Sequence, residues 1–210
     1  MERRPFAASQ RGDTLMALEL ITPPAVEPVT LTEAKKQCRV ELDFIDEDDF
    51  ISSLITSARE YCEGFSNRAY LTQTWGLWLD NLPVGACIRI PLPPLQSVTS
   101  IKYYDTANVE AIMAVADYFV DDKSEPGRVS LAYGKSWPST TLRPVNGIFI
   151  EFVAGYGNAP TAVPKKVKQA MLLLIGYWYE HREAAMTGTV SREVEFSTHA
   201  LLWQDRIIPV

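Results

Sequence analysis

The sequence has little of what catalytic and metal-binding sites usually require. It contains two histidines and three cysteines in 210 residues, and the cysteines are widely spaced without a Cys-x-x-Cys motif. Two histidines are too few for most histidine-built metal sites, and an odd number of scattered cysteines indicates reduced thiols in a cytoplasmic setting. Residues 1–13 also lack the apolar core of a signal peptide. The apolar run Ala170–Tyr179 is too short to span a bilayer, so no membrane contact is expected.

Basic residues are also scarce relative to acidic ones. Twenty Lys and Arg stand against 26 Asp and Glu, which gives a formal net charge of −6. General nucleic-acid binding needs a dense basic surface, because most of its affinity comes from neutralising phosphates. The charge therefore argues against such binding, although DNA could still pass along an acidic surface. The remaining composition, 47% hydrophobic and 22% charged, is typical of a soluble globular chain with one large domain or one domain with extended arms.

The one stretch that resembles a nucleotide-binding motif fails on spacing. Residues 132–139 read AYGKSWPS and contain a Gly-Lys-Ser. A phosphate-binding loop needs another glycine where Val129 stands, and it needs a helix after the serine. The dipeptide Trp137-Pro138 disfavours that helix. We therefore expect a turn that ends a strand.

Other clusters of polar residues have structural explanations. Asp46–Asp49 lacks the spacing of a calcium loop and would complement the dipole at the start of a helix. His181 and its charged neighbours would end a helix, where a basic side chain is favourable. The sequence GYGNAP is not a dinucleotide fingerprint, and no Gly-x-Ser-x-Gly context occurs. We predict no catalytic residue, no metal ligand and no cofactor, and hence no enzyme.

Two helices are predicted before residue 67. Thr30-Leu-Thr-Glu33 fits a capping box, in which the Thr30 hydroxyl accepts from the Glu33 amide while Glu33 reaches back. A short helix over residues 31–40 should follow. Next comes ELDFIDEDD, which has six carboxylates in residues 41–49. Apolar residues then recur every three or four positions from Phe50 to Phe65, which predicts a second helix.

The middle of the chain changes to the period of two that is typical of strands. About six short strands are predicted between Tyr70 and Tyr156, with turn residues and no helix between them. This order favours an antiparallel sheet or small sandwich. A long helix over residues 164–186 should follow. The predicted fold is therefore α+β, with the N-terminal helices and the long C-terminal helix packed together and the β-rich part inserted between them.

The C-terminal helix is apolar on nearly all sides through its middle. A surface helix would keep a polar face, so this one must be buried by the sheet, by the first two helices or by another subunit. Gly176 at its centre costs about 1 kcal/mol relative to alanine. We infer that another element approaches closely there.

Three regions are expected along the chain. Residues 1–15 are predicted to be a disordered extension, because Met16 could be a natural start. Residues 16–186 form the main domain, with helices in 31–66 and 164–186 and the β-rich insertion at about 70–156. Residues 187–210 form a C-terminal arm with a short strand or a last helical turn. The alternative for this tail is that it folds back on the chain's own sheet.

Six segments follow one another along the chain: ITPPAVEPVTLTEAKKQCRV, LITSAREYCEGFSNRAYLTQTW, LPPLQSVTSIKYYD, FVAGYG, VPKKVKQAMLLLIGYWYEHREA and LLWQDRI. This ordered set resembles the head–tail connector, or adaptor, proteins of long-tailed phages and of the gene-transfer agents derived from them. The likeness extends from about Leu20 to Arg206. The strands between Tyr70 and Tyr156 exceed those of the smallest, mainly helical connectors.

The resemblance implies a structural virion protein that is assembled in the host cytoplasm and located in the virion neck. Connectors form a ring, expected to be a dodecamer, beneath the portal protein. A head-closure (stopper) or tail-terminator protein docks on this ring, and DNA passes through the lumen without specific binding. The alternatives are another neck component, such as a head-closure or tail-completion protein, or a small intracellular α+β enzyme or ligand-binding domain.

The same resemblance suggests where the ring makes its contacts. Ser197–Val210 would reach the portal, and the Pro-rich segment Ile21–Val29 would lie on a neighbouring subunit. The predicted interface residues are Pro23, Pro24, Val26, Pro28, Leu201, Leu202, Trp203, Arg206, Ile207 and Ile208.

Overall fold

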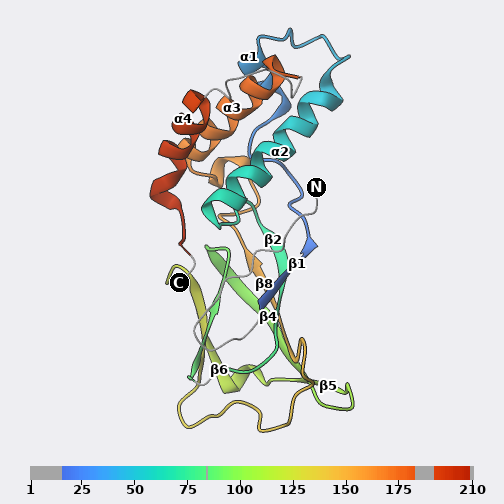
Figure 1. Ribbon diagram of the computed structural model, residues 1–210, viewed down its shortest axis with the longest axis vertical. Coiled ribbons are helices and arrows are strands. Elements are labelled where there is room, and N and C mark those ends of the chain that lie inside the picture. Colours follow the sequence, from blue (N-terminus) through green and yellow to red (C-terminus); the bar gives the residue numbers. More distant parts are fainter. Residues whose placement is uncertain (1–15, 84, 183–191, 209–210) are drawn as a thin grey trace. The chain divides into compact units, whose positions relative to one another are not determined.

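The computed structural model of the chain describes residues 16–83, 85–182 and 192–208 (Figure 1). The predicted extension, residues 1–15, lies outside this range. The chain divides into two compact units. The helical unit consists of Pro24–Leu71 and Tyr156–Ile207, and the β-unit of Thr72–Gly155 with the segment before Pro24 and with Ile208. The two kinds of secondary structure confirm the predicted α+β class.

Helix starts and stops in the helical unit follow local signals in the sequence. Its helices are α1 (Leu31–Cys38), α2 (Asp48–Ser66), α3 (Lys165–Glu180) and α4 (Arg192–Leu202), with 3-10 turns at Pro160–Ala162 and Trp203–Asp205. The capping box is confirmed: the Glu33 amide donates to the Thr30 hydroxyl at 3.2 Å, and the Thr30 amide donates to the Glu33 carboxylate at 2.8 Å. The residues after α1 and α2, Arg39 and Asn67, take left-handed backbone angles and end these helices.

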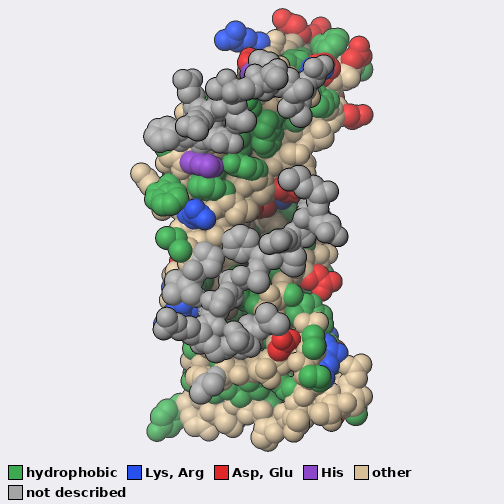
Figure 2. Space-filling view, viewed as in Figure 1, with side chains coloured by type: hydrophobic (Ala, Val, Ile, Leu, Met, Phe, Trp, Pro, Cys, Tyr) green, Lys and Arg blue, Asp and Glu red, His purple; other side chains and the backbone are tan. Residues whose placement is uncertain are grey.

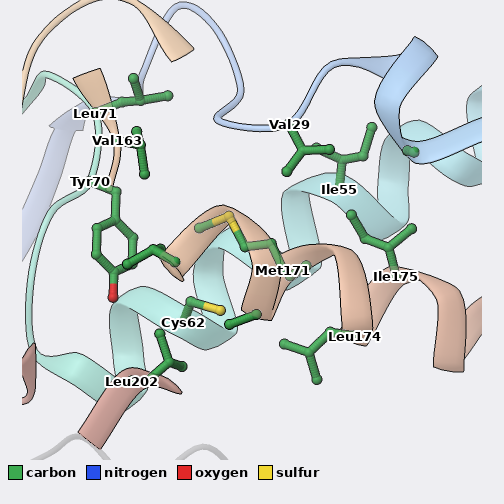
Figure 3. Close-up of a cluster of buried hydrophobic side chains, with 14 of the residues drawn as sticks. Val29, Ile55, Cys62, Tyr70, Leu71, Val163, Met171, Leu174, Ile175 and Leu202 are labelled. Carbon is green, nitrogen blue, oxygen red and sulfur yellow. The ribbon is translucent and has the colours of Figure 1, made fainter. Parts of the chain in front are cut away.

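Helix α3 lies at the centre of the helical unit's core. Helices α1, α2 and α4 all pack against it, which explains why its apolar residues surround it. Gly176 has a close neighbour as predicted, because a Cβ there would lie 3.3 Å from the Gln37 side chain of α1. The fully or nearly fully buried core residues, several of which are drawn in Figure 3, are Val29, Ala34, Ile51, Ile55, Ala58, Cys62, Tyr70, Leu71, Val163, Val167, Ala170, Met171, Leu174, Ile175 and Leu202.

The β-unit contains two antiparallel sheets. Its strands are β1 (Met16–Thr22), β2 (Gln73–Leu79), β3 (Cys87–Ile90), β4 (Leu95–Tyr104), β5 (Glu110–Ile112), β6 (Tyr118–Asp121), β7 (Gly127–Leu131) and β8 (Ile148–Ala154). One sheet has the order β1-β2-β8-β4-β5 and the other β3-β7-β6. The sheets touch where Gly127 of β7 meets Leu95 of β4, so closely that a Cβ on Gly127 would lie 2.6 Å from the Leu95 Cβ.

The alternation of residues in the strands sets the inner face of the larger sheet. Ile148, Ile150, Phe152 and Ala154 of β8 are all buried, and the residues between them are partly exposed. In the register of the sheet, Leu77 of β2 lies opposite Ile150. The period of two therefore predicted these strands correctly. It did not predict β1, an edge strand whose apolar side chains at Leu18, Leu20 and Ile21 all remain partly exposed.

The Gly-Lys-Ser stretch forms the predicted turn after a strand. Gly134 has a positive φ of 72°, and the Lys135 amide donates to the Ala132 carbonyl at 3.0 Å. Residues 136–147 contain no helix. The geometry of a phosphate-binding loop is therefore not formed in this segment.

The C-terminal region differs in detail from the sequence prediction. The helix expected over residues 164–186 ends at Glu180, where the His181 amide caps it by donating to the Tyr177 carbonyl; residues 183–191 lie outside the described range. The expected arm instead contains α4, and Leu202 at its end enters the core of the helical unit. The tail thus folds back on the chain's own helices. Within the described residues, no helix combines the length and apolar character needed to cross a membrane.

Candidate assembly surfaces

The Pro-rich segment is fastened to α2 of its own chain. Pro28 is buried and Val29 enters the core, while Pro24 is half-buried and Pro23 exposed. Glu27 between them accepts hydrogen bonds from Arg59 and Thr56, which are residues of α2. These bonds measure 2.8 Å for Arg59 Nε and 3.0 Å for the Thr56 hydroxyl. Of the predicted interface residues in this segment, Pro23 and Val26 offer the most surface.

The C-terminal residues after α4 are tied to the far end of α2. The Ile207 amide donates to the Ser66 carbonyl at 2.9 Å, and the Asn67 side-chain amide donates to the Ile207 carbonyl at 2.8 Å. The Lys166 ammonium pairs with Asp205 at 2.8 Å. This segment is therefore a firmly attached part of the helical unit and not a loose tail.

Trp203, Arg206 and Ile207 form what we call the C-terminal corner. The Trp203 side chain is 60% exposed. The Arg206 guanidinium lies 5.4 Å from the centre of the Trp203 ring and 5.0 Å from that of Phe65. Of the remaining predicted residues, Leu202 is fully buried and Leu201 partly buried, so neither adds much to a docking surface, whereas Ile208 is exposed.

The loop between α1 and α2 forms a further surface, which was not predicted from the sequence. We call residues 41–47 the acidic loop. Three of its large apolar side chains, Leu42, Phe44 and Ile45, are 53%, 44% and 70% exposed. They alternate with carboxylates, a pattern visible in the sequence but interpreted there only as charge near a helix start. Asp48 and Asp49 do stand in the first turn of α2, as that interpretation predicted.

A buried lysine holds the acidic loop in place. The Lys35 side chain is only 3% exposed, and its ammonium lies 2.5 Å from the Asp48 carboxylate. The same ammonium donates to the carbonyls of Leu42 at 3.2 Å and Phe44 at 2.8 Å. A buried cation needs such partners because its desolvation is costly. Lys35 therefore fixes the backbone of the loop from beneath.

The other end of the loop is bound to the end of α3. The Tyr179 hydroxyl and the Arg182 guanidinium both donate hydrogen bonds to the Glu47 carboxylate. The pKa of Glu47 lies below its usual value, chiefly because of the Tyr179 bond and then because of Arg182. Arg182 also stacks on the rings of Phe50 and Tyr179, 4.8 Å and 4.7 Å from their centres. The acidic loop is thus anchored at both ends.

Titratable groups with shifted pKa values are explained by structural contacts. Burial raises the pKa of the Cys62 thiol to about 12, in the middle of the core. Asp121 has a lowered pKa because it accepts hydrogen bonds, first from the Ser124 hydroxyl and then from backbone amides in the turn after β6. Among the residues that the structure describes, no group of three or more His, Cys, Asp and Glu could hold a metal ion.

The long loop before β8 is fixed to the outer face of the larger sheet. Arg143 lies 4.2 Å from the centre of the Tyr104 ring and 5.8 Å from that of Trp78. Its guanidinium also donates to the Asn146 carbonyl at 2.8 Å and to the Asn108 side chain at 2.6 Å. The contacts of Arg143 that hold this loop therefore lie near the surface of the β-unit.

Comparison with known proteins matches part of the chain to a family. Residues 28–118 match the family of phage gp6-like head-tail connector proteins. The resemblance to head–tail connectors is confirmed. The matched range includes α1, the acidic loop, α2 and strands β2 to β5, but neither β1 nor the C-terminal corner. No curated protein matches the chain.

Solved structures extend the likeness to nearly the whole chain. A chain from the neck of an empty gene transfer agent particle, determined with C6 symmetry, matches with a TM-score of 0.77 and 24% identity, over 92% of this chain and 97% of that one. A chain from the neck of the native particle, determined with C12 symmetry, matches with a TM-score of 0.73 and 24% identity. The match covers 92% of this chain and 97% of that one. A chain from the virion of the native gene transfer agent particle matches with a TM-score of 0.74 and 24% identity. The match covers 92% of this chain and 96% of that one. At this identity, the likeness establishes a shared fold.

Proposed function

We propose that the chain is a structural protein of a virion neck, a head–tail connector that forms a ring beneath the portal. The observation that carries the proposal is the fold shared with neck chains of gene transfer agents over 92% of this chain. The family match over residues 28–118 supports the same role. The ring is proposed to contain twelve copies, and the C12 symmetry of one matching neck supports that number.

The proposed partners follow from a place in the neck. One side of the ring binds the portal, and a head-closure (stopper) or tail-terminator protein docks on the other. DNA passes through the lumen without specific binding, which agrees with the net charge of −6 because an acidic wall does not gain affinity by neutralising phosphates. The protein assembles in the host cytoplasm and remains in the virion.

The exposed apolar residues fit an assembly role. Trp203 and Ile208 at the C-terminal end, and Val26 in the Pro-rich segment, are large hydrophobic side chains with 40% or more of their surface exposed. Aromatic residues and arginine are common anchors at protein interfaces. We propose that the Pro-rich segment contacts a neighbouring subunit and that the C-terminal segment contacts the portal or a neighbouring subunit.

Light scattering of the purified protein, alone and mixed with its portal, tests this function. We expect either a ring in solution or stoichiometric recruitment of the protein onto the portal. A protein that stays monomeric and ignores the portal would refute the proposal. Binding to a tail protein but not to the portal would instead identify a head-closure or tail-completion component.

A further inference from the structure

We propose that the acidic loop of one copy docks on the C-terminal corner of the next copy and so makes the contact that closes the ring. The inference rests on the proposed function, because it names the partner of a surface that a ring requires. A closed ring needs two different, complementary surfaces on each subunit. The helical unit offers one acidic and one basic surface, and both expose apolar side chains.

The acidic loop has the features of a preformed binding surface. Its exposed side chains are apolar at Leu42, Phe44 and Ile45, and Lys35 holds the backbone beneath two of them. A surface that is already rigid loses little conformational entropy on binding. Figure 2 shows acidic and hydrophobic side chains together at the end of the helical unit where this loop lies. An isolated chain leaves these apolar groups in water.

The charge of the acidic loop and of the first two residues of α2 specifies the chemistry of the partner surface. Residues 41–49 hold six carboxylates, which equals the whole net charge of −6, so the rest of the chain is electrically balanced. Glu47 and Asp48 are paired with Arg182 and Lys35. The other four form no ion pair with any described residue, and all are exposed: Glu41, Asp43, Asp46 and Asp49. The partner surface must therefore be basic and partly apolar.

The C-terminal corner has this complementary chemistry. Arg206 stacks on Trp203, is partly exposed and forms no ion pair with a described residue. A carboxylate from another chain would give the guanidinium an ion-pair partner and a charge-assisted hydrogen bond. Trp203 supplies apolar surface for the side chains of the loop. Tryptophan and arginine are also the residue types most often found to dominate binding energy.

The positions of the two surfaces make the contact intermolecular. The acidic loop precedes the first turn of α2, and the C-terminal corner contacts its last residues, Phe65 and Ser66. The 19 residues of α2 separate these ends by about 27 Å at the rise of an α-helix. Figure 1 shows the loop and the corner at opposite ends of the helical unit. The loop cannot reach the corner of its own chain, but head-to-tail contacts between copies can join them.

Charge reversal on each surface tests this pairing. The loop variant D43K/D46K and the corner variant R206E are prepared as full-length proteins, with E60K/D122K and R89E as controls that change equal charge at other exposed sites. Assembly is measured by light scattering over a range of concentrations, alone and with the portal. We expect the loop and corner variants each to need roughly tenfold or more protein for half-assembly, because like charges would then face each other. The controls should match the parent.

Mixing the two variants gives the decisive result. In a 1:1 mixture, the basic loop of one variant faces the acidic corner of the other, and each remaining junction keeps its natural charges. Assembly should therefore return in particles that contain both variants in equal number. Circular dichroism checks that each variant is folded. If R206E does not fold, R206Q, which removes the charge at similar size, replaces it in the unmixed assay only, because a neutral corner cannot restore the charge pairing in the mixture.

The outcomes separate this inference from the proposed function. If the parent assembles and both variants assemble equally well, the pairing is wrong while the connector role stands. If each variant fails and the mixture does not recover, the acidic loop binds the portal or another component and the pairing is again wrong. If the parent itself forms no ring and does not bind the portal, the proposed function fails.

Discussion

The two units of the chain stabilise their exposed segments in different ways. In the helical unit, the acidic loop depends on the buried ammonium of Lys35, and the C-terminal corner is bonded to the end of α2. In the β-unit, the long loop before β8 is held by Arg143 on a half-buried aromatic surface. Removing a buried anchor leaves polar groups without partners, whereas water can replace most surface contacts. Substitutions of these anchoring residues should therefore destabilise the helical unit more than the β-unit. The surfaces that we assign to assembly belong to the helical unit.

The largest effect is expected for Lys35→Met. The substitution keeps most of the length of the side chain but leaves the Asp48 carboxylate and the carbonyls of Leu42 and Phe44 without their donor. We expect a loss of about 3 kcal/mol in the free energy of unfolding and a large loss of ring assembly. Urea unfolding followed by helical circular dichroism measures the first. A variant as stable as the parent would show that the lysine does not anchor the loop.

The β-unit should lose stability when a side chain is enlarged where its two sheets touch. Gly127→Ala places a methyl group 2.6 Å from two carbon atoms of Leu95. We expect a destabilisation of about 1–3 kcal/mol, because the sheets must separate slightly to make room. Urea unfolding followed by tryptophan fluorescence measures this change. Unchanged stability would mean that the contact between the sheets is looser than described.

An intermediate loss of stability is expected when the helix cap of α1 is removed. Thr30→Ala removes the hydroxyl that accepts from the Glu33 amide. The expected cost is about 1 kcal/mol of unfolding free energy, while Thr30→Ser should cost less because serine also caps helices. If alanine and serine behave alike in urea unfolding, the capping bond contributes nothing measurable.

The other glycine contact should give a small effect of opposite sign. Gly176→Ala meets only the flexible Gln37 side chain, at 3.3 Å, and alanine is the better helix former. We expect a gain of about 0.5 kcal/mol in the free energy of unfolding, measured in the same urea experiment. A loss comparable to that of Gly127→Ala would contradict the distinction between the two contacts.

The smallest effect is expected on the stability of the fold as a function of pH. The pKa of Glu47 is lowered in the folded protein, so the bonds from Tyr179 and Arg182 stabilise the fold when this carboxyl is ionised. That stabilisation is present above the unfolded value of about 4.5 and is lost as the pH falls through the folded pKa. Glu47→Gln should thus be less stable than the parent at pH 7, and the difference should be smaller at pH 3. An equal difference at both pH values would exclude this cause.

Local signals in the sequence predicted much of the fold. The capping box at Thr30 and the three- and four-residue periodicity in α2 act within a few residues, and both were confirmed. The alternation in β8 gave the buried face of the larger sheet. Strand β1 was missed because its pairing with β2, more than fifty residues later in the chain, leaves no local pattern.

The assembly surfaces depend on contacts that the sequence does not reveal. Lys35 stands in the run KKQCR, where nothing distinguishes a buried lysine from its exposed neighbour Lys36. The burial of Leu202 depends on how α4 packs against the other helices, which is a tertiary effect. The exposed apolar residues of the acidic loop were visible in the sequence, but their exposure was not.

We propose that this chain forms a ring in a virion neck. Electron microscopy of the protein assembled with its portal tests it most directly, because class averages show the number of subunits around the axis. We predict a ring of twelve copies with an open centre, in which helical units contact one another head to tail. Monomers scattered separately on the portal, or a closed particle without a central opening, would contradict the account.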